Sequence, residues 1–363
     1  MKKLQPLLLV LGLVLGLVAV LAAVQLGLQA AGKQFCLTQL TMSMYYALVV
    51  IGLCVVMGYA GQVSLGHGAF FAIGGYTSAV LTTHDFSFAK DTAWGKAFSV
   101  LHVFIPKEDF LGGSVLTVSP TAAFAAAMAL TLVIACMIGY PALRLRGHYL
   151  AMATLGFGLI VYKMVLGSAI TGAADGITGV PEWDLGLVKI CGSSSARVSN
   201  YYFAGIVLLT ALLLLRNLVT SRVGRAMQAL HDGETTAGTM AIDTASYKLK
   251  AFVVSAILAA LAGVLFTHYT GGIAPSQAGA LQSVRYVALA AVGGMANLWG
   301  GAIISTAINF FSLRGWFGSY DNAVFGALLI AIVSLTPEGP LKPMGQYLRR
   351  QLGKRPGGGH GVA

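Results

Sequence analysis

The feature that most constrains this chain is a series of apolar stretches, several of them close to the length of a membrane-spanning helix. Such a helix needs about 20 predominantly apolar residues to cross the hydrocarbon core of a bilayer. Apolar residues make up 57% of the 363 residues, charged residues only 10%, and the mean hydropathy is +0.79. This composition lies well outside the globular range. It predicts an all-α fold, a polytopic bundle of membrane helices.

We expect about ten membrane spans, some of them broken or re-entrant at glycine-rich positions, with eight or nine full crossings as the alternative. The N-terminal apolar run extends to about Leu28, beyond the roughly 7–15 apolar residues of a signal peptide, and we interpret it as a retained first span. The expected spans cover residues 5–30, 38–58, 65–83, 119–141, 148–167, 201–217, 249–269, 281–297, 299–313 and 321–336.

Basic residues gather in short segments beside these spans, and most of the 23 Lys and Arg fall on one side if the N-terminus is cytoplasmic. The basic residues beside the spans explain the net charge of +11, so this charge does not indicate a nucleic-acid partner. The distribution of these basic residues predicts a transmembrane domain over residues 1–341 with both termini cytoplasmic. Residues 84–118 would form an extracytoplasmic loop and 216–250 a cytoplasmic segment, followed by a disordered cytoplasmic tail over 342–363.

The cytoplasmic segment 216–250 is a polar island in an otherwise apolar chain. Ser221 or Thr220 is expected to cap a helix that starts near Arg222. The apolar side of this helix would be available either to the groove of a partner protein or to the membrane interface, and the sequence leaves both alternatives open. That side consists of Val223, Ala226, Met227 and Leu230, with Arg222, Arg225 and Gln228 toward the other side.

Two glycine-rich runs, over residues 58–76 and 293–301, indicate one helix break in each half of the chain. Transporters build substrate routes from such discontinuous helices, whereas ordinary small-residue packing is the simpler alternative. His67 could line a route, although a packed, hydrogen-bonded histidine is the commoner outcome. The candidate translocation path or gate comprises Gln62, Ser64, His67, Gly74, Thr154, Asp175, Gly293 and Asn297.

Several kinds of site are missing from the sequence. It has no G-x-x-x-x-G-K-[ST] loop for ATP and neither HExxH nor G-x-S-x-G, and its four cysteines lack metal-ligand spacing. We therefore expect no catalytic residues, no metal and no cofactor bound by this chain. Two charges within apolar spans, Lys163 and Arg285, lie near enough to helix ends to reach the interface.

Several segments, in order over most of residues 45–310, closely resemble the membrane subunits of branched-chain amino acid ABC importers of the LivM type. The resemblance implies an ABC importer permease of the LivH, LivM and ribose-permease type. The segments are GQVSLGHGAFFAIGGY (61–76), PALRLRGHYLAMATLGFG (141–158), TGAADGITGVP (171–181), SRVGRAMQAL (221–230), LAGVLF (261–266) and AAVGGMANLWGG (290–301).

The resemblance implies a bacterial inner-membrane permease that is not itself an enzyme. Its partners would be a second, LivH-type permease subunit, two ATP-binding subunits that bind ATP and Mg, an extracytoplasmic substrate-binding protein and membrane lipid. Related permeases import urea or short-chain amides, and this substrate class is the alternative. A stand-alone secondary transporter is disfavoured because paired intramembrane carboxylates are missing. The resemblance assigns ATPase coupling to Arg222, Gly224, Arg225, Ala226, His231, Asp232, Glu234 and Gly238.

Overall fold

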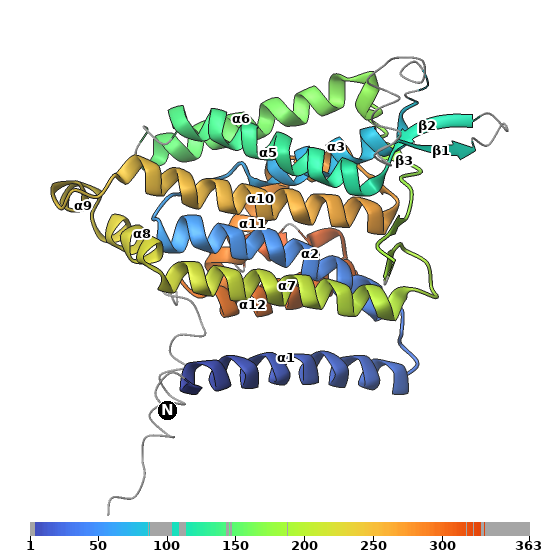
Figure 1. Cartoon of the computed structure of the whole chain (residues 1–363), viewed down its shortest axis with the longest axis horizontal. Helices are drawn as coiled ribbons and strands as arrows, with labels where there is room; N and C mark the ends of the chain where they lie inside the picture. Colours follow the sequence, from blue (N-terminus) through green and yellow to red (C-terminus); the bar gives the residue numbers. More distant parts are fainter. Residues whose placement is uncertain are drawn as a thin grey trace, which may run out of the picture.

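The structure is a bundle of long helices that lie side by side along one common direction (Figure 1). It is a computed structural model, and it describes residues 4–85, 87, 104–108, 114–142, 145, 147–186, 188–316, 318–321, 323–327 and 330. Within these residues five helices are long and apolar enough to cross a membrane. The predicted membrane helix bundle is therefore confirmed, whereas a count of about ten spans is not. The five are Cys36–Tyr59, Pro120–Ala142, His148–Gly167, Arg197–Thr220 and Thr244–Thr270.

Each expected span within the described residues overlaps a helix, and the predicted polar island contains two further short helices. The second long helix ends in a π-helical turn, Val55–Tyr59. The α-helices are α1 (Leu4–Ala30), α2 (Cys36–Cys54), α3 (His67–Thr83), α5 (Pro120–Ala142), α6 (His148–Gly167), α7 (Arg197–Thr220), α8 (Arg222–Asp232), α9 (Glu234–Thr239), α10 (Thr244–Thr270), α11 (Ala280–Val292) and α12 (Leu298–Leu313).

The two ends of the bundle differ in structure (Figure 1). Helices α8 and α9 lie at one end, where α1 also begins, and short β-strands lie at the other, which we call the strand end. The all-α prediction is incomplete, because connections at the strand end form two-stranded antiparallel pairs. These are β1 (Phe104–Glu108) with β2 (Ser114–Val118), β3 (Ile177–Thr178) with β6 (Gly272–Ile273), and β4 (Trp183–Asp184) with β5 (Lys189–Ile190).

The core lies where α2, α3 and α10 meet. Rings from neighbouring helices cluster there, with the Tyr46 ring centroid 5.9 Å from that of Phe71 and 5.3 Å from that of Phe266. Glycine lets α3 and α10 approach closely, because a Cβ on Gly74 would overlap the backbone of Ala260. Gly74, expected at a gate, is therefore a helix-packing residue in this structure.

Some expectations fall outside the described residues. These are the tail 342–363, most of the loop 84–118, most of the last expected span, and the expected cytoplasmic residues Arg144 and Arg146. Within the loop, the described strands β1 and β2 form a hairpin at the strand end (Figure 1).

Candidate functional site

The candidate site begins at α8, the helix predicted in the polar island. Ser221 caps it, since its hydroxyl oxygen accepts a 3.3 Å hydrogen bond from the Gly224 backbone N–H. The apolar residues Met227 and Leu230 are buried against α7, α10 and the π-helical turn. We expected this side to be open to a partner or to the membrane interface, and that expectation is wrong, because the bundle itself covers it. The exposed side of α8 is polar and carries Arg222, Arg225 and Gln228.

The two glycines assigned to ATPase coupling have different surroundings. A Cβ on Gly224 would overlap the backbone carbonyls of Leu218 and Val219, so glycine is needed for the tight turn from α7 into α8. A Cβ on Gly238, in α9, would meet nothing within 4 Å. Gly224 therefore fixes the position of α8, and Gly238 is an exposed surface position. Ala226 is half-buried on α8.

An ion pair ties α9 to the start of α10. Lys248 Nζ lies 2.7 Å from Glu234 Oε1, and the side chains are 8% and 30% exposed. Removing one member of a shielded pair leaves the other charge poorly solvated, so the pair resists separation of the two helices. The resemblance assigns Glu234 to ATPase coupling but gives no sign of its partner Lys248. Asp232, the last residue of α8, is exposed.

The exposed end of α8 contacts the irregular segment 60–66, which joins the π-helical turn to α3. Gly61 in this segment has φ of 66°, and a Cβ there would lie 3.0 Å from His231 Nδ1 and 3.2 Å from His231 Cα. This contact brings a predicted coupling residue against the predicted helix break. Gly61 itself is not among the predicted site residues, although a glycine just after a helix is typical of a position with positive φ.

Within segment 60–66, polar side chains point into the bundle. Gln62 is 3% exposed, and within the described part of the chain neither amide atom has a hydrogen-bond partner. His67 shares hydrogen bonds with Ser64 at 3.1 Å and with Ser255 of α10 at 2.6 Å. The histidine is thus a buried, fully bonded link between the segment and α10, the commoner outcome named above.

Thr154 holds the same segment from its other side. Its hydroxyl oxygen accepts a 3.0 Å hydrogen bond from the Leu65 backbone N–H, and it donates one of 3.0 Å to the Ala151 carbonyl within α6. Segment 60–66 is therefore held between α6, α8 and α10.

The two glycine-rich breaks, expected in separate halves of the chain, touch each other in space. Tyr59 donates a 2.5 Å hydrogen bond to the carbonyl oxygen of Ala296, and a Cβ on Gly58 would overlap the backbone of Met295. The second break joins α11 to α12, where the side chain of Asn297 caps α12 by accepting from the Gly300 N–H at 3.1 Å. Asn297 thus stabilises a helix start in this structure.

Two candidate path residues lie elsewhere or have a packing role. A Cβ on Gly293 would lie 2.5 Å from Gly301 Cα, so this glycine allows α11 and α12 to pack. Asp175 is exposed in the turn before β3, at the strand end. The structure therefore brings Gln62, Ser64, His67 and Thr154 together around segment 60–66 and leaves Asp175 far from them along the bundle.

The charged residue Arg285 on α11 is half-buried, and its contacts differ from the expectation. Arg285 does not reach for the interface but pairs with Asp321 at 3.2 Å, donates to the hydroxyl of Ser312, and places its guanidinium 4.0 Å from the centre of the Phe325 ring. Lys163 is exposed in the last turns of α6. Among the described residues, no group of three or more His, Cys, Asp or Glu side chains could hold a metal ion.

The fold and this arrangement define a helical membrane permease. A family model described as "Branched-chain amino acid transport system / permease component" matches residues 35–333. The chain belongs to this family of permease components.

Curated relatives agree with this assignment. The chain is 30% identical to the high-affinity branched-chain amino acid transport system permease protein LivM of Escherichia coli K12, over 84% of this chain and 69% of LivM. It is 29% identical to LivM of Salmonella typhimurium, over 87% of this chain and 72% of that protein. It is 25% identical to the related permease protein LivH of E. coli K12, over 83% of this chain and 92% of LivH. No solved structure matches the chain.

Proposed function

We propose that this chain is a membrane-spanning subunit of an ATP-driven, binding-protein-dependent importer of branched-chain or other hydrophobic amino acids, working by alternating access. The observation that carries the proposal is the geometry of α8, whose exposed side is polar while its other side is packed against α7, α10 and the π-helical turn. A partner that pushes on the polar side moves the helices that the buried side contacts. The relatives' names support the substrate class.

The transmission runs through two contacts. One joins His231 to Gly61 and so to segment 60–66, which carries Gln62 and is hydrogen-bonded to His67 through Ser64. The other is the ion pair between Glu234 and Lys248, which reaches α10. Closure of the ATP-binding subunits would displace α8 and α9, and these contacts would rock the bundle between states open to opposite sides.

We infer a set of partners from the family. A second permease subunit of LivH type and two ATP-binding subunits complete the importer, the latter holding ATP and Mg, and an extracytoplasmic protein delivers the substrate. The assembly sits in a bacterial inner membrane, with both termini and the α8–α9 end on the cytoplasmic side. The basic residues Arg222 and Arg225 at this end support that orientation, because cytoplasmic segments retain positive charge.

Transport by the reconstituted assembly tests the proposal. The chain, its companion permease, the ATP-binding subunits and the binding protein are placed in proteoliposomes, and uptake of labelled leucine and of labelled urea is measured with and without ATP. We expect leucine uptake that requires both ATP and the binding protein. Urea uptake without leucine uptake would instead establish the amide alternative. Leucine uptake by the chain alone, driven by an ion gradient, would overturn the importer proposal.

A further inference from the structure

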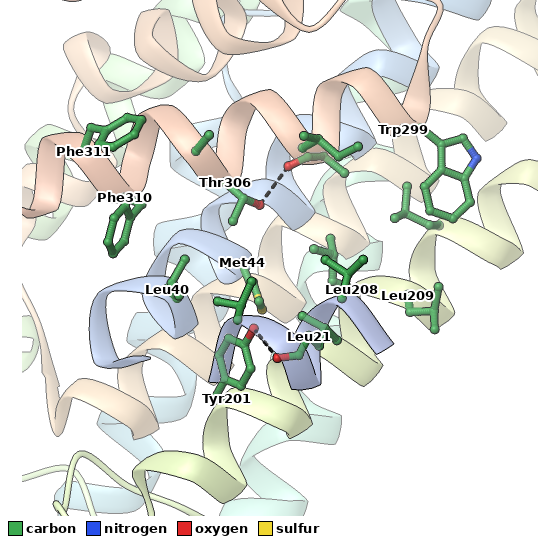
Figure 2. Close-up of a pocket in the computed structure, with 16 residues that line it drawn as sticks. Leu21, Leu40, Met44, Tyr201, Leu208, Leu209, Trp299, Thr306, Phe310 and Phe311 are labelled. Carbon is green, nitrogen blue, oxygen red and sulfur yellow. Dashed lines mark hydrogen bonds between the residues drawn. The ribbon is translucent and has the colours of Figure 1, made fainter. Parts of the chain in front are cut away.

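A cavity of about 340 Å³ lies between α1, α2, α7 and α12, away from the α8–α9 site (Figure 2). Figure 2 shows Phe310 and Phe311 at one end of its lining and Trp299 at the other, with Leu21 of α1 and Met44 of α2 between them. The cavity is more than twice the size of the roughly 150 Å³ apolar cavities that bind benzene. It is therefore large enough for a substantial apolar ligand.

The lining has almost no polar groups to offer a ligand. Its two hydroxyls already donate to backbone carbonyls, Tyr201 to Leu21 at 3.3 Å and Thr306 to Ala302 at 2.7 Å, as the dashed lines in Figure 2 mark. Apart from the indole of Trp299, the remaining lining side chains are aliphatic, aromatic or thioether groups. A hydrocarbon fits this lining, whereas an amino acid would leave its charged groups unpaired.

The cavity is elongated along the membrane-crossing direction. From Trp299 to Phe311, α12 rises about 18 Å at about 1.5 Å per residue, and side chains along this whole stretch line the cavity. Lipid chains in a bilayer run in the same general direction as the helices that cross it. The shape therefore matches one extended acyl chain.

The mouth of the cavity faces the membrane hydrocarbon. Val20 of α1 and Ile303 of α12 both belong to the lining and are 60% and 59% exposed. In a helix bundle that crosses a bilayer, exposed apolar side chains at mid-helix positions face lipid. The surrounding medium thus supplies the hydrocarbon that can enter between α1 and α12.

Cations lie at the strand end of the cavity, beyond Phe310 and Phe311. Lys33 lies in the connection from α1 to α2, and Arg314 directly follows α12, with its guanidinium 4.6 Å from the centre of the Phe35 ring. Within the described residues no ion pair engages either cation. Basic groups at the level of the headgroups attract the phosphate of a phospholipid.

We propose that this cavity binds one acyl chain of a membrane phospholipid, whose phosphate lies near Lys33 and Arg314, and that the lipid fastens α1 to the rest of the bundle. If this apolar cavity were empty, the side chains that line it would lose packing contacts. The bound acyl chain restores these contacts and so stabilises α1 in its position against the bundle. The site is separate from the transport proposal, since none of its lining residues contributes to segment 60–66 or to α8.

Fluorescence of Trp299 tests the proposal directly. Phe replaces Trp94, Trp183 and Trp316, so that Trp299 is the remaining tryptophan of the four in the chain. The purified full-length protein, washed in detergent, is titrated with phosphatidylglycerol brominated on its acyl chains, because bromine quenches nearby indole. We expect quenching that saturates at one lipid per protein, together with one retained phospholipid in native mass spectrometry.

Matched variants separate the cavity from the general lipid surface. Ala307→Phe fills the cavity and is expected to abolish the saturable quenching, whereas Leu214→Phe, at an exposed position of α7 outside the lining, leaves it intact. Arg314→Gln preserves the lining and is expected to raise the lipid concentration for half-quenching several-fold. Quenching that rises without saturation, or that is equal in the parent and in Ala307→Phe, would overturn the proposal. Absence of both quenching and retained lipid in the parent would overturn it as well.

Discussion

Gly61, in the irregular segment before α3, lies directly against His231 at the end of α8. A Cβ on Gly61 would approach His231 Nδ1 to 3.0 Å, and the φ of 66° at Gly61 already disfavours any other residue. Because of this contact, α8 cannot move toward the bundle without displacing segment 60–66. The predicted coupling loop and the predicted helix break therefore form one mechanical unit.

Gly61→Ala should impair transport more than it impairs stability. The left-handed conformation costs an alanine about 1–2 kcal/mol, and the added methyl group pushes His231 away. A change of about 1.4 kcal/mol in a rate-limiting conformational step lowers uptake about tenfold. Gly186→Ala is the matched control, since Gly186 has φ of 80° but no atom within 4 Å of a Cβ. Equal uptake by the two variants, at equal expression, would contradict the role of this contact.

Glu234→Gln should destabilise the chain more than Lys248→Met does. The first change leaves a lysine ammonium that is only 8% exposed without its carboxylate, whereas the second leaves a carboxylate that is 30% exposed and can be hydrated. We expect a loss of roughly 1–3 kcal/mol for Glu234→Gln, below the roughly 3–5 kcal/mol seen for fully buried pairs. Thermal unfolding in detergent measures both. The reverse order of the two melting temperatures would show that the pair is not shielded as described.

Gly224→Ala and Gly238→Ala should have opposite effects, although both glycines belong to the predicted coupling segment. An alanine methyl group at position 224 would overlap the backbone at the end of α7, and such overpacking lowers the free energy of unfolding by about 1–3 kcal/mol. At Gly238 the methyl group meets nothing, and alanine favours the helical state of α9 by about 0.5–1 kcal/mol. Thermal unfolding and uptake distinguish the two. A tolerated Gly224→Ala would contradict the tight α7–α8 turn.

Gln62→Met should raise the melting temperature and lower uptake. The buried amide of Gln62 lacks partners within the described residues, and an unpaired buried polar group costs about 1–3 kcal/mol, which methionine avoids at similar volume. If the amide finds partners in another state of the transport cycle, the substitution traps the state described here. Unchanged uptake with a raised melting temperature would show that Gln62 has no role in the translocation path.

The length of the apolar runs was enough to predict the helices, and local signals predicted several of their ends. Ser221 before the amphipathic stretch correctly indicated the start of α8, and the glycine-rich run around Gly294 correctly indicated the break before α12. Such signals are local, so a single sequence carries them.

The contacts between distant segments could not be predicted in the same way. The apolar stripe of α8 is visible in the sequence, but only the fold shows that the bundle itself covers Met227. The meeting of Tyr59 with Ala296 and the pairing of Arg285 with Asp321 depend on how helices pack. Periodicity gives the face of one helix and not the identity of its neighbour.

Site-specific photocrosslinking tests whether the exposed polar side of α8 docks on an ATP-binding subunit. A photoreactive amino acid replaces Gln228 on that side, or Val198 in α7 at the opposite end of the bundle as the control. Both variants are irradiated in membranes that contain the co-expressed importer subunits. We expect a crosslink to the ATP-binding subunit from position 228 and none from position 198. A variant at position 228 that transports leucine normally but gives no such crosslink would show that the polar side of α8 does not dock on an ATP-binding subunit.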